Sequence, residues 1–163
     1  MNNFDKLEVK NQQALKEVNI KPTEESVLAK LSIEPETIKS IKPRWKRTQY
    51  RAVINWLTKY NSQPDASNLE KVKGYLEAFH HLCVVEDWER ANKMLSIRLD
   101  TPTHEELHNQ LNTWGYYREL VELYNRILGK LNPDWDTIFF MVWARFPMFG
   151  ETIPRRLNIF SRV

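Results

Sequence analysis

The sequence has little glycine, one cysteine and no long apolar run, and each shortage excludes something. Four glycines among 163 residues provide for few backbone positions with positive φ. The single cysteine, Cys83, excludes an internal disulfide and fits a reducing compartment. No apolar run approaches the roughly 20 residues of a membrane span, and the N-terminus lacks the pattern of a signal peptide. We therefore expect a soluble cytoplasmic protein with no membrane partner.

The residues that are abundant favour helices. Hydrophobic residues make up 42% of the chain, which is enough for a core. Leucine, glutamate, lysine, arginine and glutamine are plentiful and are good helix formers, whereas the clean apolar and polar alternation of half-buried strands is hard to find. We predict an all-α protein. The net charge of +3 is too mild to imply a nucleic-acid partner by itself.

Changes in composition divide the chain into four parts. Residues 1–43 are polar and are expected to be weakly structured, with Thr23 as the cap of a marginal helix. Residues 44–66 contain a basic helix, over about 47–60, and a linker. Residues 67–136 carry helical repeats, and residues 137–163 form an irregular tail. Within the third part, Ser67 and Glu70 predict a capping box for a helix that runs to about Val84.

The apolar residues of this helix predict its buried face. Leu69, Val72, Leu76, Phe79 and Cys83 form one stripe, with Tyr75 and Leu82 beside it.

Two segments after this helix share one sequence pattern, which is typical of a helical hairpin. Each places an aromatic residue at a tight turn, Trp88 in the first and Tyr117 in the second, 29 residues apart. A packing residue follows three positions later, Ala91 or Leu120, and each is expected at a helix crossing. With breaks at Pro102 and Pro133 and a possible cap at Thr103, residues 67–131 are predicted to form four helices in two antiparallel hairpins.

Five segments in this region carry a resemblance to a known family: Gly74–Cys83, Glu86–Ala91, Glu105–Leu111, Thr113–Glu119 and Leu131–Asp136. Together they resemble the atypical leading repeats of cyanobacterial tetratricopeptide-repeat proteins, over about two fifths of the chain. The resemblance implies a short α-solenoid of stacked helix pairs with a concave peptide-binding face. It also implies a non-enzymatic protein-interaction scaffold, whose partner is another protein or peptide and which needs no cofactor or metal.

Binding would use the inner face of the first helix of each pair. The candidate protein-binding residues lie beside the packed stripe: Lys73, His80, Glu105, Asn109 and Asn112.

The family pattern stops after Asp136, where further repeats are expected. The tail instead holds two prolines and clustered aromatic residues. An adjacent reading frame through Met141–Pro154 could encode a typical repeat opening. We therefore hypothesise that the chain is a frameshifted fragment of a longer repeat protein, the alternative being a genuinely divergent C-terminus.

Two other readings come from local motifs. His104-Glu105-Glu106-Leu107-His108 matches the HExxH pattern of zinc hydrolases, although proline and threonine precede it and the repeat needs Leu107 and His108 for packing. The stretch 39–51 is rich in lysine and arginine, and no acidic residue lies between Glu36 and Asp65. It could bind nucleic acid weakly, but a solvated basic helix face is the preferred interpretation, so a nucleic-acid partner is not expected.

A cluster of nucleophilic or metal-ligating type is also present at His80, His81 and Cys83. Two successive residues of a helix cannot both face one site, and a cysteine on an apolar stripe usually packs. We therefore interpret these three residues as structural.

Overall fold

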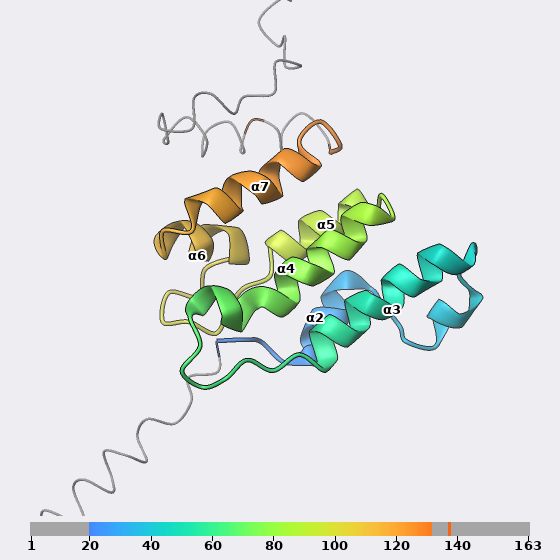
Figure 1. The fold of residues 1–163 in the computed structure, drawn as a ribbon, viewed down its shortest axis with the longest axis horizontal. Helices are drawn as coiled ribbons and strands as arrows, with labels where there is room; N and C mark the ends of the chain where they lie inside the picture. The colour runs from blue at the N-terminus through green and yellow to red at the C-terminus, as the bar shows by residue number, and fades with distance from the viewer. Residues whose placement is uncertain (1–19, 132–136, 138–163) are drawn as a thin grey trace, which may run out of the picture.

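The computed structural model describes residues 20–131 and Thr137. Six α-helices and one 3-10 helix make up the described residues (Figure 1): α2 (Glu24–Leu31), η1 (Thr37–Ser40), α3 (Arg44–Thr58), α4 (Asn68–Val84), α5 (Trp88–Leu95), α6 (Leu107–Thr113) and α7 (Tyr117–Ile127). In this part of the chain the only β-type pairing is one isolated antiparallel bridge, between Arg98 and Glu106. The expected all-α class is confirmed. The predictions for the tail, and for residues 1–19, lie outside the described residues.

Helix α4 lies at the centre of the fold, between α3 and α5. The hydroxyl of Ser67 accepts a hydrogen bond from the Glu70 backbone N–H at 3.2 Å, as the capping box requires. The reciprocal half of the box is not made, because the Glu70 carboxylate accepts instead from the Tyr60 hydroxyl at 2.6 Å. The helix therefore starts where predicted, but its first glutamate ties it to the end of α3.

The buried face of α4 is rotated from the predicted stripe. Val72, Phe79 and Leu82 are buried as expected, whereas Leu76 and Cys83 are only partly buried. The reason is α3, which packs along the other side of α4 and makes the most extensive helix contact among the described residues. Two neighbours on different sides move the buried centre away from the face that the hairpin alone would cover.

Gly74 lies at a close approach of α3 and α4. A Cβ atom built at this glycine would lie 2.7 Å from the Trp56 carbonyl oxygen and 3.2 Å from the Tyr60 ring. Glycine in a helix interior is disfavoured by roughly 1 kcal/mol relative to alanine. Here its missing side chain allows the two helix backbones to approach.

The two hairpins share one turn geometry. The turn between α4 and α5 places Glu86 at φ 61°, and the turn between α6 and α7 places Gly115, 29 residues later, at φ 83°. In both turns the next residue donates its backbone N–H to a carbonyl five positions back, Asp87 to Leu82 at 3.0 Å and Tyr116 to Leu111 at 2.9 Å. The repeated hairpin predicted from the sequence is therefore repeated in backbone conformation.

The packing positions of the two hairpins are also equivalent. Ala91 on α5 is 0% exposed, and Leu120 on α7 is 1% exposed. The four helices expected in residues 67–131 are present as α4 to α7, and α4 contacts α5 as α6 contacts α7. The second hairpin is clipped, because α6 has seven residues where α4 has 17.

The segment between α5 and α6 departs from the prediction that Thr103 caps a helix. Helix α6 begins at Leu107, and its N-cap residue, Glu106, makes no side-chain cap hydrogen bond. The Thr103 hydroxyl donates instead to the Gln110 side chain at 2.9 Å, as does the buried Thr101 hydroxyl at 2.7 Å. The cap prediction was wrong because the Thr103 hydroxyl bonds to the Gln110 side chain rather than to a backbone N–H at the start of a helix.

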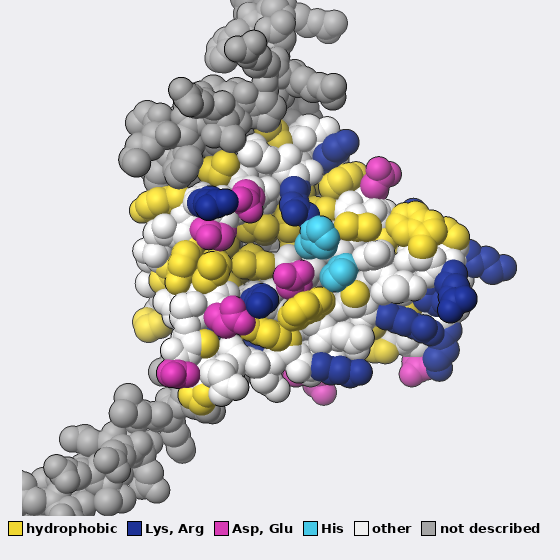
Figure 2. All heavy atoms as spheres, in the orientation of Figure 1, with side chains coloured by type: hydrophobic (Ala, Val, Ile, Leu, Met, Phe, Trp, Pro, Cys, Tyr) yellow, Lys and Arg dark blue, Asp and Glu magenta, His cyan; other side chains and the backbone are white. Residues whose placement is uncertain are grey.

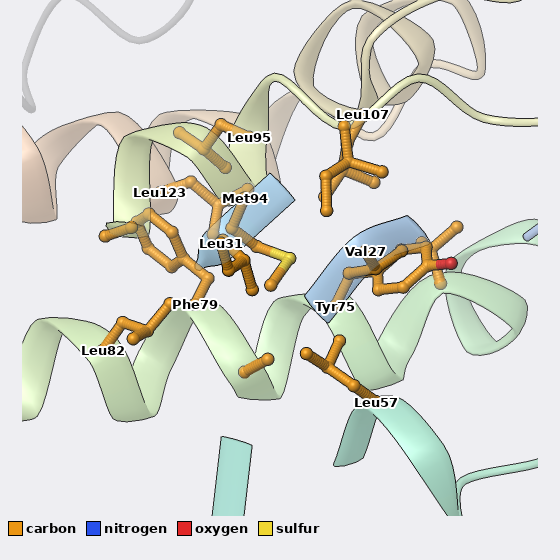
Figure 3. Packing of buried hydrophobic residues seen from close by; sticks show 14 of the residues in the cluster. Val27, Leu31, Leu57, Tyr75, Phe79, Leu82, Met94, Leu95, Leu107 and Leu123 are labelled. Atoms are coloured by element: carbon orange, nitrogen blue, oxygen red, sulfur yellow. The ribbon is translucent and has the colours of Figure 1, made fainter. Parts of the chain in front are cut away.

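Residues 20–43 are more ordered than the sequence patterning indicated. The hydroxyl of Thr23 does cap α2, accepting from the Ser26 N–H at 3.3 Å. Val27 and Leu31 are buried, and Figure 3 shows them among core side chains of α4 and α5. The short helix is stable because it docks, which is the usual way in which an eight-residue helix is held in water.

A polar network around Asp87 joins α2, α3 and α5. The Asp87 carboxylate accepts from the Tyr50 hydroxyl at 2.6 Å and from the Arg90 guanidinium at 2.7 Å, and it caps α5 through the Arg90 N–H. Arg90 also donates to the Leu31 carbonyl at the end of α2, at 2.7 Å. Burial alone would raise the pKa of Asp87, but the hydrogen bonds from Tyr50 and Arg90 outweigh it and lower that pKa. Burial and the Asp87 carboxylate raise the pKa of Tyr50 to about 12.

Candidate functional site

A groove of about 220 Å³ lies between α4 and α7. Its lining residues come from one face of each helix: Leu76, Glu77, Phe79 and His80 from α4, and Glu119, Glu122, Leu123 and Arg126 from α7. Glu119, Glu122, Leu123 and Arg126 share a face because their spacings of three, four and seven residues match the helical period. The groove therefore forms where α7, from the second hairpin, lies beside α4, from the first.

The groove has an apolar floor and a charged rim. Phe79 and Leu123 are buried. Leu76 packs against the same core but is only partly buried. Three carboxylates stand around this floor, from Glu77, Glu119 and Glu122, against one guanidinium, from Arg126. Figure 2 shows hydrophobic side chains between α4 and α7 with acidic side chains on both helices. Three carboxylates against one guanidinium make the rim mainly acidic.

Polar contacts fix parts of the rim. The Arg126 guanidinium contacts the His80 Nδ1, which links the two walls of the groove. Glu122 pairs with Arg118 at 3.5 Å, and both side chains are mostly exposed. Glu77 and Glu119 take part in no salt bridge with another described residue. An exposed pair such as Arg118–Glu122 is weak and can be exchanged at little cost. The carboxylates of Glu77, Glu119 and Glu122 can therefore pair with a cation of a binding partner.

The groove includes one of the five binding candidates named from the sequence. His80 lines the groove, but the other four are not among its lining residues. Lys73 pairs with Glu70 at 3.3 Å, and Glu105 accepts from the Thr113 hydroxyl at 2.8 Å. Asn109 is exposed on α6, and Asn112 is partly buried with its Oδ1 unpartnered among the described residues. Sequence reasoning missed the α7 wall, whose periodic spacing was the available signal.

The HExxH match does not form a helical pair of histidines. His104 lies in a turn at φ 48°, and α6 begins only at Leu107, so His104 and His108 are not one turn apart on a helix. The buried His108 instead has its Nδ1 2.8 Å from the Tyr124 hydroxyl and its Nε2 3.0 Å from Glu106. Within residues 20–131 and 137, no three His, Cys, Asp or Glu side chains are grouped as metal ligands.

His80, His81 and Cys83 point to different neighbours. His80 contacts Arg126 on α7, whereas the His81 Nδ1 lies 2.6 Å from the Gln49 side chain on α3. Burial, and to a smaller extent the neighbouring His80, lowers the pKa of His81. Burial raises the pKa of the Cys83 thiol to about 11, so it is protonated at neutral pH. A thiol in that state is a poor nucleophile.

The chain matches no protein-family model, and searches of curated proteins and of solved structures likewise find no match. The resemblance to tetratricopeptide repeats stays a prediction. Within the part of the chain that the structure describes, no helix is both long and apolar enough to cross a membrane.

Proposed function

We propose that this protein is an interaction module of the tetratricopeptide type that binds a partner protein through the groove between α4 and α7. The observation that carries the proposal is the groove itself, an apolar floor with a mainly acidic rim. The repeated turn and the buried Ala91 and Leu120 support the repeat assignment, because stacked helix pairs expose long concave surfaces that bind other chains.

The chemistry of the groove indicates the kind of partner. The partly buried Leu76 offers apolar surface at a position where an incoming side chain can cover it. Glu77, Glu119 and Glu122 surround that surface with negative charge. The partner segment should therefore carry a large apolar side chain flanked by lysine or arginine. Charge complementarity of this kind sets orientation and association rate, and the apolar anchor supplies the affinity.

The proposal can be tested with a displayed library of short random peptides selected on the immobilised full chain. Enriched peptides should combine an aromatic or aliphatic residue with lysine or arginine. Their affinities would be measured by isothermal titration calorimetry for the unaltered protein and for two groove variants, Leu76→Ser and Glu119→Lys. Each variant should weaken binding by about tenfold or more, because one removes the anchor surface and the other reverses a rim charge.

The matched controls lie outside the groove. Glu34→Lys makes the same charge reversal at an exposed position before η1, and Asn109→Ala tests the face first suggested by the sequence. Neither should change the affinity. If Asn109→Ala or Lys73→Ala abolished binding while Leu76→Ser did not, the binding face would be that of the first helices and the groove assignment would be wrong. A selection that enriched no peptide would also refute the proposal.

A further inference from the structure

Basic side chains gather at the end of the molecule formed by η1 and the N-terminal half of α3. The cations are Lys39, Lys42, Arg44, Lys46, Arg47 and Arg51, and no acidic residue lies between Glu36 and Asp65. Figure 2 shows the lysine and arginine side chains collected over this end, to the right of the view. The Arg47 guanidinium donates to the Lys39 carbonyl at 3.1 Å, which holds η1 against α3.

Little of this charge is neutralised. Lys39 pairs with Glu36 at 3.4 Å, where both side chains are more than three-quarters exposed. None of Lys42, Arg44, Lys46 and Arg51 forms a salt bridge with another described residue. Lys42, Arg44 and Arg51 are exposed. A concentration of unpaired cations attracts anions and raises their local concentration.

An exposed aromatic ring lies beside one of these cations, Lys46. Trp45, the second residue of α3, is 50% exposed, and the Lys46 Nζ lies 5.6 Å from its ring centroid. The other large hydrophobic side chains that are exposed in the described residues, Val84 and Tyr117, lie on α4 and α7. A half-exposed indole flanked in sequence by lysine and arginine provides one stacking surface together with several phosphate ligands.

We propose that Trp45 and the cations that flank it in sequence, Lys42, Arg44, Lys46 and Arg51, bind single-stranded nucleic acid wrapped around the start of α3. A base stacks on the Trp45 ring while neighbouring phosphates meet the four cations. Unstacked bases are available in a single strand, whereas a duplex hides their faces. A membrane surface fits less well, because Trp45 is a single apolar contact and an interfacial helix needs a continuous apolar face. The inference is independent of the groove between α4 and α7.

The test measures fluorescence anisotropy of a labelled oligothymidylate of about 12 nucleotides, a length within the usual range for one binding surface. The full chain should bind it at low salt. Four cations that each contribute about 0.7 predict a slope of log K against log salt of about −3. Trp45→Ala should lower the affinity by about tenfold, and Trp45→Phe should retain most of it, because a phenyl ring still stacks. The double variant Arg44→Ala/Arg51→Ala should flatten the slope by about one unit or more.

The matched control removes the same charge elsewhere. Lys93→Ala/Arg118→Ala deletes two cations from α5 and α7 and should leave the slope unchanged. Circular dichroism of each variant verifies its fold. Absence of binding at low salt would overturn the proposal, as would equal loss in the control pair or no effect of Trp45→Ala. Polyglutamate competing as well as the oligonucleotide, or stronger binding to vesicles containing phosphatidylserine, would assign the surface to another anionic partner.

Discussion

Gly74→Ala should destabilise the protein, although alanine is the better helix former. The position is interior to α4, where replacing glycine by alanine ordinarily stabilises a helix by roughly 1 kcal/mol. In this fold the added methyl group would lie 2.7 Å from the Trp56 carbonyl oxygen. That atom belongs to the backbone of α3 and cannot rotate away. The two helices must therefore separate or tilt.

The magnitude follows from the size of the overlap. Ordinary van der Waals contact for a Cβ begins near 3.4 Å, so α3 and α4 must part locally by about 0.7 Å. Overpacking of a filled interface typically costs about 1–3 kcal/mol. After the roughly 1 kcal/mol gain in helix propensity is subtracted, the net destabilisation should be about 0–2 kcal/mol, with no net stabilisation.

Urea unfolding followed by far-ultraviolet circular dichroism measures this change as a shift in the midpoint at unchanged slope. Asn125→Ala on α7 is the matched control, because Asn125 is exposed and alanine raises helix propensity there without a contact. It should leave stability equal or raise it by a few tenths of a kcal/mol.

A stabilisation of Gly74→Ala by the roughly 1 kcal/mol of helix propensity would refute the reasoning. It would mean that α3 does not approach α4 at Gly74 in solution. The consequence would reach beyond one residue, because the integration of residues 44–66 with the repeats depends on that contact.

The remaining predictions concern the core, the turns and the polar network. Leu95→Ala, at a side chain 1% exposed, should cost about 2–5 kcal/mol in urea unfolding, and Leu76→Ala should cost clearly less because it is only partly buried. Glu86→Gly should stabilise by about 0.5 kcal/mol by relieving a positive φ, and Gly115→Ala should destabilise by about 1 kcal/mol, both read from thermal melts. The pKa of Asp87 is lowered by folding, so its contribution to stability is present above the ordinary carboxyl pKa of about 4 and is lost as pH falls below it. Asp87→Asn should therefore flatten the acid limb of stability against pH, and an unchanged limb would contradict the assignment.

Local patterns predicted the hairpins well. The cap at Ser67, the turns before Trp88 and Tyr117, and the buried Ala91 and Leu120 all depend on neighbours within a few positions in sequence. Such features can be read from spacing because the backbone conformation and the packed face are set locally.

Features that depend on residues far apart in the sequence could not be predicted from local patterns. Nothing near Gly74 in sequence indicates the carbonyl of Trp56, and the docking of Val27 and Leu31 depends on α4 and α5. Thr103 is a reasonable cap by pattern, but Gln110 competes for its hydroxyl. Among the residues that line the groove, the sequence named only His80 as a binding candidate. The spacing of the α7 residues indicates that they share one face, but it does not indicate that this face lies beside α4, which depends on how the second hairpin packs against the first.

The position of α3 also explains why binding is expected at the groove rather than along the whole first helix. At Gly74, α3 packs against one side of α4. The Tyr60 hydroxyl bonds to Glu70 in the first turn of α4, and Glu70 also pairs with Lys73. Helix α5 covers another side. The remaining accessible surface of α4 includes Leu76, Glu77 and His80, which face α7. The packing of α3 therefore leaves this face of α4 accessible, and the proposed binding of a partner would use it.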